Sequence, residues 1–207
     1  MAKILWEMLG PPVGYGIMTD LFSLIFVRWE PLACTMAGAL AVLPVLLWTC
    51  LKKTGGRTEI CGLDIQDGGV CIFSGIAACL AVNTLIKASG LPGIFTGFSQ
   101  RAGDLYGPSA GLQICAMGVV IPLTEELIFR ELGFGRLREH TGFLQAALLS
   151  SALFGLWHGN VVQGLYGFCM GIMFAWTLER KKTVAAPVLM HMAANLTSVA
   201  VTALGGL

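Results

Sequence analysis

The chain has 207 residues, of which 56% are hydrophobic and only 12% are charged, and its formal net charge is +1. A soluble domain carries about 25% charged residues, so this composition argues against a soluble globular protein. The near-neutral charge and the lack of a basic tract with interleaved aromatic residues argue against nucleic-acid binding.

The apolar residues lie in blocks of about 17–25 residues, the length with which a helix crosses a bilayer core of about 30 Å. We therefore predict an all-α fold, a polytopic transmembrane bundle of about seven helices. The seven cysteines are scattered and form no C-x-x-C pair, so neither a disulfide framework nor a structural zinc site is indicated. The amino-terminal residues lack the features of a cleaved signal peptide.

Residues 1–109 are expected to form an N-terminal membrane region of about three spans with interfacial loops. Pro11 and Pro12 are expected to stop any helix that begins at the N-terminus. The predicted spans are residues 15–27, 31–51 and 70–85. A polar linker is predicted at residues 54–69, and residues 89–111, which are rich in glycine and proline, are predicted to be a long loop.

Residues 110–207 are expected to form a second region with four helices. These helices are predicted at residues 112–135, 143–157, 161–178 and 184–203, with Pro122 kinking the first of them. The predicted topology places one group of basic residues on the side of the N-terminus: Lys3, Lys52, Lys53, Arg57, Arg136, Arg138, Arg180, Lys181 and Lys182. The other side carries only Arg28, Lys87 and Arg101. Basic residues accumulate on the cytoplasmic side, so we predict a cytoplasmic N-terminus. The compact size and the lack of a eukaryotic targeting segment favour a bacterial cell membrane.

Charged residues interrupt the first helix of the second region, among them Glu125, Glu126 and Arg130. Burying them in hydrocarbon costs several kcal/mol unless they are paired or hydrated. Glu126 and Arg130 are four residues apart with the acid first, which favours an ion pair on one helix face. Glu125 points about 100° away from Glu126 and is therefore expected to face a cavity.

Further polar residues lie in the later helices. His191 and Asn195 share one helix face, and Phe154 lies one turn before His158 and is expected to pack beside it. The earlier spans hold little polar material beyond Asp20 and Asn83. Isolated polar residues often serve only helix packing, but this clustering in the last four helices favours a function. Proton or ion carriers place the same residue types at membrane depth, so a small ion-coupled carrier is an alternative.

The spacing of these residues resembles a known family. Glu125-Glu126-x-x-x-Arg130, Phe154-x-x-x-His158 and His191-x-x-x-Asn195 follow one another in this order. They resemble the three motifs of the CPBP family, the CAAX proteases and bacteriocin-processing enzymes that are also called the Abi family. The resemblance covers roughly residues 110–200. The family is similar to the type II CAAX prenyl endopeptidases. In place of the usual glycine after the arginine, this chain has Glu131.

The resemblance implies an intramembrane endopeptidase without a cofactor, whose catalytic core is residues 110–207 and whose substrate is a membrane-associated peptide or protein. It implies that Glu125 is the general base on a water, helped by His158, and that His191 and Asn195 stabilise the oxyanion. The supporting residues it implies are Glu126, Arg130 and Phe154. Peptide-precursor maturation and bacteriocin self-immunity are the expected physiological roles.

Two other catalytic mechanisms and one non-catalytic function stay open at this point. Zinc could be held by Glu125, His158 and His191 with a water as fourth ligand, although the chain has no H-E-x-x-H sequence. A serine or cysteine nucleophile could come from Ser150, Ser151, Ser198 or Cys169, none of which has a base at a diagnostic spacing. A non-catalytic membrane scaffold or regulator with the same fold is the third.

The depth of the candidate residues in the membrane can be counted from the predicted cytoplasmic loops. At about 1.5 Å per residue, this count puts His158 deeper than Glu125 and His191.

Overall fold

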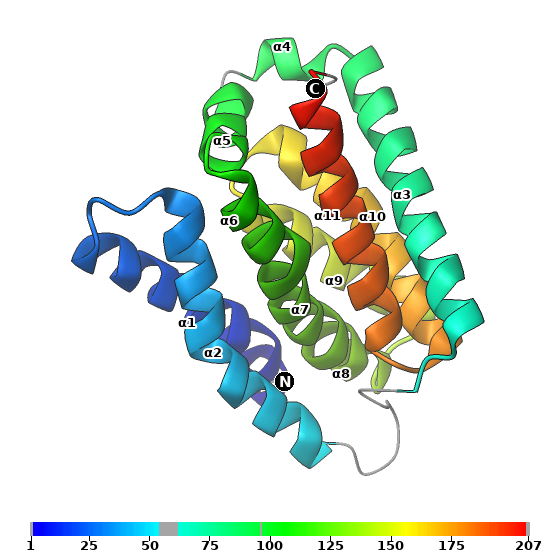
Figure 1. Cartoon of the computed structure of the whole chain (residues 1–207). Helices are drawn as coiled ribbons and strands as arrows, with labels where there is room; N and C mark the ends of the chain where they lie inside the picture. Colours follow the sequence, from blue (N-terminus) through cyan, green and yellow to red (C-terminus); the bar gives the residue numbers. More distant parts are fainter. Residues whose placement is uncertain (1, 54–61, 96, 206–207) are drawn as a thin grey trace.

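The computed structural model describes residues 2–53, 62–95 and 97–205. In this part of the chain the regular elements are helices, and no β-sheet is formed (Figure 1). The prediction of an all-α fold is therefore confirmed. The predicted polar linker begins outside the described residues, since residues 54–61 are not among them.

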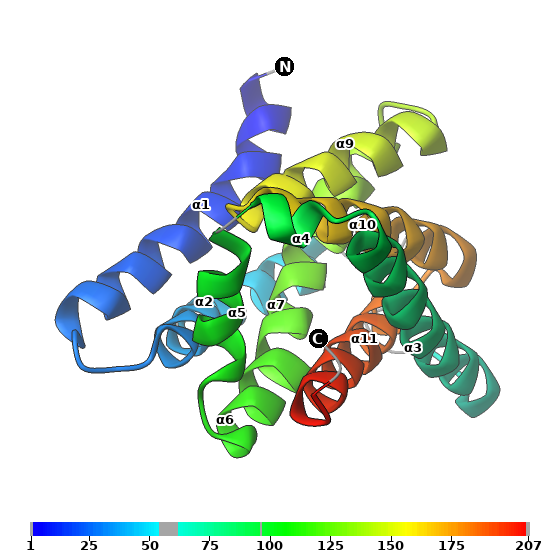
Figure 2. The same ribbon diagram turned by 90° about the horizontal axis from the view of Figure 1, so that it is seen from above.

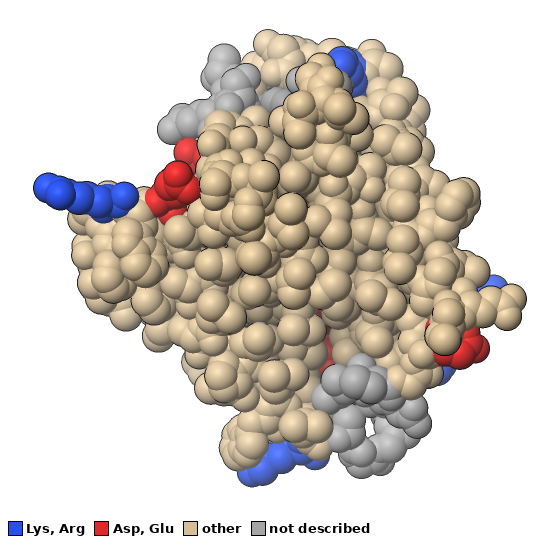
Figure 3. All heavy atoms as spheres, in the orientation of Figure 1, with Lys and Arg blue, Asp and Glu red and all other residues tan. Residues whose placement is uncertain are grey.

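Five of the helical segments in the described residues are long and apolar enough to cross a membrane. They are Pro31–Lys52 in α2 (Pro31–Lys53), Ile65–Ala88 (α3), Ala110–Arg138, Val161–Lys181 (α10) and Ala185–Ala203 (α11). Helix α9 (Phe143–Trp157) is apolar but only 15 residues long. The predicted spans at residues 15–27 and 143–157 therefore do not meet this criterion. Figure 3 shows a broad face with few charged side chains, which gather near its rim.

The N-terminal segment differs from its prediction. Pro11 and Pro12 do not stop the helix, because α1 runs without interruption over Ala2–Ile25. A proline inside a helix removes one hydrogen bond and usually bends the helix, and the ribbon of α1 changes direction along its length (Figure 2). Packing offsets that cost: Tyr15 is fully buried and stacks on Trp157, with 5.2 Å between ring centroids.

The predicted long loop at residues 89–111 also differs. It contains two short helices, α4 (Leu91–Ile94) and α5 (Gly97–Tyr106). Glycine and proline hide them in the sequence, but Gly90 allows the left-handed turn (φ 74°) that starts α4. Leu105 and Tyr106 then pack against a small apolar cluster formed by α2 and the following helix. Helices α4 and α5 thus lie across one end of the bundle (Figure 1).

The helix that carries the acidic pair is continuous but irregular. It consists of α6 (Ala110–Cys115), η1 (Ala116–Val120), α7 (Ile121–Glu126), η2 (Leu127–Phe134) and α8 (Gly135–Arg138). The two η segments are π-helical, a rare conformation that is frequent at functional sites. Pro122 stands where η1 gives way to α7. Glu125 and Glu126 therefore lie in a short α-helical stretch between two wider turns.

Helices α3 and α11 pack very closely, as both views show (Figures 1 and 2). A Cβ atom added at Gly75 would collide with the backbone oxygen of Met190, the residue before His191. We expect Gly75→Ala to push the helices apart and to lower the free energy of unfolding by about 1–3 kcal/mol, measured by thermal unfolding in detergent. Gly69→Ala is the control, because a Cβ there meets nothing within 4 Å. Equal stability of the two variants would contradict this close contact.

Candidate active site

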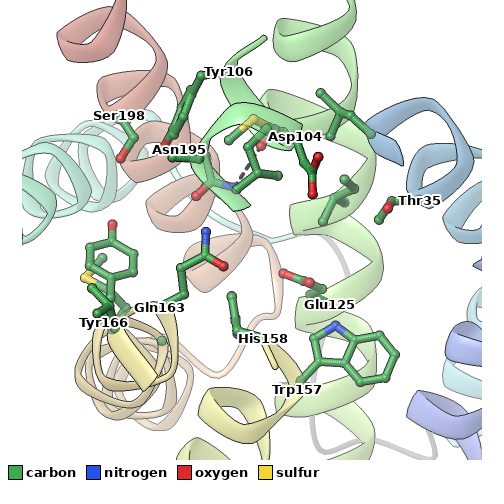
Figure 4. Close-up of a pocket in the computed structure, with 18 of the residues that line it drawn as sticks. Thr35, Asp104, Tyr106, Glu125, Trp157, His158, Gln163, Tyr166, Asn195 and Ser198 are labelled. Atoms are coloured by element: carbon green, nitrogen blue, oxygen red, sulfur yellow. Dashed lines mark hydrogen bonds between the residues drawn. The ribbon is translucent and has the colours of Figure 1, made fainter. Parts of the chain in front are cut away.

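One cavity of about 940 Å³ collects residues from the separate motifs. Glu125 from α7, His158 from the end of α9, and His191 and Asn195 from α11 all line it. Figure 4 shows Glu125, His158 and Asn195 around this space. The sequence count of depth would separate His158 from the others, but the packing of the helices brings it to the same cavity.

Glu126 lies behind this cavity and is fully buried. Its Oε2 atom is 3.1 Å from Nε of Arg130, so the ion pair suggested by the four-residue spacing is present. Its Oε1 atom accepts a hydrogen bond of 2.8 Å from Nδ1 of His191. Glu126 therefore joins α7 to α11, a link that the sequence alone did not indicate.

Arg130 is also completely buried, and aromatic rings surround its guanidinium group. The Cζ atom lies 4.3 Å from the ring centre of Phe154 and 5.2 Å from that of Phe174. Such cation–π contacts are worth about 2 kcal/mol when desolvated. Space for the group depends on Gly171, because a Cβ there would lie 3.1 Å from an Arg130 terminal nitrogen and 2.9 Å from Oγ of Ser151.

Phe154 contacts both histidines as well as Arg130. Its ring lies edge-on to His158, with centroids 4.9 Å apart, and edge-on to His191, with centroids 5.8 Å apart. Phe174 stacks on the ring of His191, with centroids 4.8 Å apart. The expectation that Phe154 packs beside His158 is confirmed, and the same ring also fixes the second histidine.

The orientation of His158 follows from the end of its helix. His158 is the C-cap of α9, and its Nδ1 atom lies 2.8 Å from the backbone oxygen of Phe154. A carbonyl oxygen only accepts, so Nδ1 carries the hydrogen and Nε2 of the neutral ring is an acceptor. Gly167 of α10 leaves room for the ring, since a Cβ there would come within 3.1 Å of it.

The position of Asn195 follows from the irregular helix opposite. In the π-turn, the N–H of Ile121 donates to the oxygen of Ala116, five residues back. The next donor in that pattern would be residue 122, which is proline and has no N–H. The oxygen of Met117 is therefore left without its helical donor, and Nδ2 of Asn195 donates to it at 2.9 Å. Pro122 on one helix thus helps to position Asn195 on another.

Glu125 is 6% exposed, and its Oε2 atom lies 3.8 Å from Nε2 of His191. The indole nitrogen of Trp157 lies on the side of its ring that faces Glu125 (Figure 4). Trp157, Asp104 and Tyr166 also line the cavity, and sequence reasoning missed them. Asp104 lies in a segment that was predicted to be a loop. Trp157 directly precedes His158 in the sequence, and only this adjacency could have pointed to it.

The zinc alternative does not fit these side chains as placed. Among the described residues, no group of three or more histidine, cysteine, aspartate or glutamate side chains is arranged to hold a metal ion. This arrangement supports no step through a metal.

The alternative nucleophiles also lack the partner that they need. Ser150 donates to the backbone oxygen of Ala147, and Ser198 lies 3.2 Å from the sulfur of Cys79. In the described part of the chain, neither serine is bonded to a histidine. Of the four candidate nucleophiles, only Ser198 lines the cavity.

Comparison with known proteins agrees with the motif pattern. Residues 107–197 match the family described as type II CAAX prenyl endopeptidase Rce1-like. Over 84 residues, the chain is 38% identical to the "Putative membrane peptidase YdiL" of Bacillus subtilis (strain 168). This alignment covers 41% of the present chain and 34% of the relative, so the chain spans about a third of that protein. No solved structure is significantly similar to the chain.

Proposed function

Because residues 107–197 match the family described as type II CAAX prenyl endopeptidase Rce1-like, we propose that this protein is an intramembrane endopeptidase. It would hydrolyse a peptide bond in a membrane-associated protein or peptide precursor. The observation that carries the proposal is the single cavity lined by Glu125, His158, His191 and Asn195. A cavity of about 940 Å³ is large enough for water and several residues of a peptide.

In the proposed reaction, Glu125 removes a proton from a water whose oxygen attacks the carbonyl carbon of the substrate. The C–N bond of the resulting tetrahedral intermediate then breaks, and Glu125 returns the proton to the leaving amine. The nearly complete burial of Glu125 supports this role, because general bases act best when solvent does not compete for the proton. His158 would help by accepting a hydrogen bond from the same water through Nε2.

His191 and Asn195 would stabilise the oxyanion of the intermediate. A ring that donates from Nδ1 to Glu126 can donate from Nε2 only as an imidazolium, so this role requires the charged form of His191. Asn195 uses one amide hydrogen for Met117, and its second hydrogen would serve the oxyanion. Donors fixed in advance in this way cost little reorganisation during the reaction.

Residues 110–207 would form the catalytic core, with α1 to α5 completing the wall of the cavity. Salt bridges support a common cytoplasmic end for the N-terminus and the basic residues, since Arg136 pairs with Glu7, Lys181 with Asp67 and Arg138 with Glu179. We infer a multi-pass protein of the bacterial cell membrane, with peptide maturation or bacteriocin self-immunity as its role.

The purified protein in detergent micelles should cleave membrane peptides in the presence of EDTA or 1,10-phenanthroline as fast as in their absence, because Glu125 needs no metal to activate water. Cleavage is measured by mass spectrometry of the products, with a zinc protease treated in parallel as the control for chelation. Loss of cleavage that added zinc restores would contradict the glutamate mechanism. No cleavage under any condition would contradict the proposed function.

A further inference from the structure

The cavity extends well beyond the residues of the proposed reaction. Helix α5 forms part of its wall and contributes Asp104, which is only partly buried. In Figure 4 the carboxylate of Asp104 points into the space between α5 and Glu125, near Thr35 of α2. The proposed hydrolysis gives Asp104 no role.

The charged side chains around this space are mostly negative. Three carboxylates line the cavity, those of Asp20, Asp104 and Glu125, and the described lining residues include no lysine or arginine. Glu125 has His191 as its neighbour at 3.8 Å. Asp104, by contrast, forms no ion pair in the described part of the chain.

The opposite wall is chemically different. It presents neutral hydroxyl and amide groups, including Tyr166, Ser198 and Gln163, which lie on the other side of the cavity in Figure 4. A carboxylate among weakly polarisable walls attracts cations strongly, because such walls focus its field. A peptide that lies in this cavity would therefore gain most by placing a positive charge at α5 and neutral residues at the opposite wall.

Resting on the proposed function, we propose that Asp104 is a specificity-determining residue that selects substrates with a positive charge close to the cleaved bond. The charge is a lysine or arginine side chain or a free amino terminus. Asp104 binds it by an ion pair inside the cavity, and this contact fixes the direction in which the peptide lies across Glu125.

The test digests a library of random-sequence peptides, half of it acetylated at the amino terminus, with the full-length protein in micelles. Mass spectrometry then identifies the residues on each side of every cleaved bond, and the frequency of each residue type at each position is compared with its frequency in the library. For the wild type we expect lysine and arginine, or a free amino terminus in the unacetylated half, to be enriched about tenfold at one position. Asp104→Asn should remove this enrichment, and Asp104→Lys should replace it with enrichment of aspartate and glutamate.

Glu30→Gln is the matched control, because this carboxylate does not line the cavity; it should keep the wild-type preference. Cleavage that depends on Glu125 but shows no preference for positive charge would overturn the inference and leave the proposed function standing. A preference that survives in Asp104→Asn would overturn it equally. If the wild type cleaves nothing, or if Glu125→Gln cleaves as well as the wild type, the proposed function fails and the inference fails with it.

Discussion

Glutamine in place of Glu125 should lower the cleavage rate by at least about 10²–10⁴-fold while the protein stays folded. The amide has nearly the shape of the carboxylate but cannot accept a proton from water. It keeps an oxygen for contacts such as the one toward His191, which lies 3.8 Å away. The rate is measured on the fastest-cleaved membrane peptide, and folding is measured by the unfolding temperature in the same detergent.

Glu131→Gln is the matched control for this experiment. Glu131 is another buried glutamate on the same continuous helix, but it does not line the cavity. Its replacement should therefore change the rate far less than that of Glu125. Equal losses in the two variants at equal stability would argue for a general effect of charge in this helix, and the assignment of Glu125 as the base would be wrong.

Replacing Arg130 by methionine should produce the largest loss of stability, about 3–5 kcal/mol. The substitution leaves the buried carboxylate of Glu126 without its arginine partner, and it removes the cation–π contacts with Phe154 and Phe174. The unfolding temperature of the purified protein gives the measurement. The double variant Glu126→Gln with Arg130→Met should recover part of the loss, because no unpaired charge then remains buried.

Arg138→Met provides the comparison for this second experiment. Arg138 also pairs with a glutamate, Glu179, but its side chain is 39% exposed. Exposed pairs of this kind are worth about 0–1 kcal/mol, so the unfolding temperature should hardly change. If Arg130→Met is as mild as Arg138→Met, then the buried ion pair does not hold α7 in place.

The sequence predicted the helices whose apolar runs are long and uninterrupted, such as α2, α3, α10 and α11. It also pointed to the residues of the cavity, because charges and histidines stand out against an apolar background. It failed for α1 and α5, where proline and glycine masked a helix that is stabilised by contacts with distant residues. Local propensity cannot report such contacts.

The same limit applies to the bonds within the candidate site. The spacing of Glu126 and Arg130 is a property of one helix, so it was readable. The bond from His191 to Glu126 and the bond from Asn195 to Met117 join residues that are 65 and 78 positions apart. Both bonds depend on how the helices pack. The bond to Met117 also depends on a π-helical turn, which the periodicity of the sequence does not predict.

The shortness of α9 has a consequence for the lipid around it. Its 15 residues give a length of about 22 Å, against about 30 Å for the hydrocarbon core of a bilayer. A bilayer that meets so short a helix adapts by thinning locally. Headgroups and their hydration water would then lie nearer to His158, at the end of α9, than they do elsewhere along the protein. In the proposed reaction, such a thinned region would bring water closer to His158 from the lipid side.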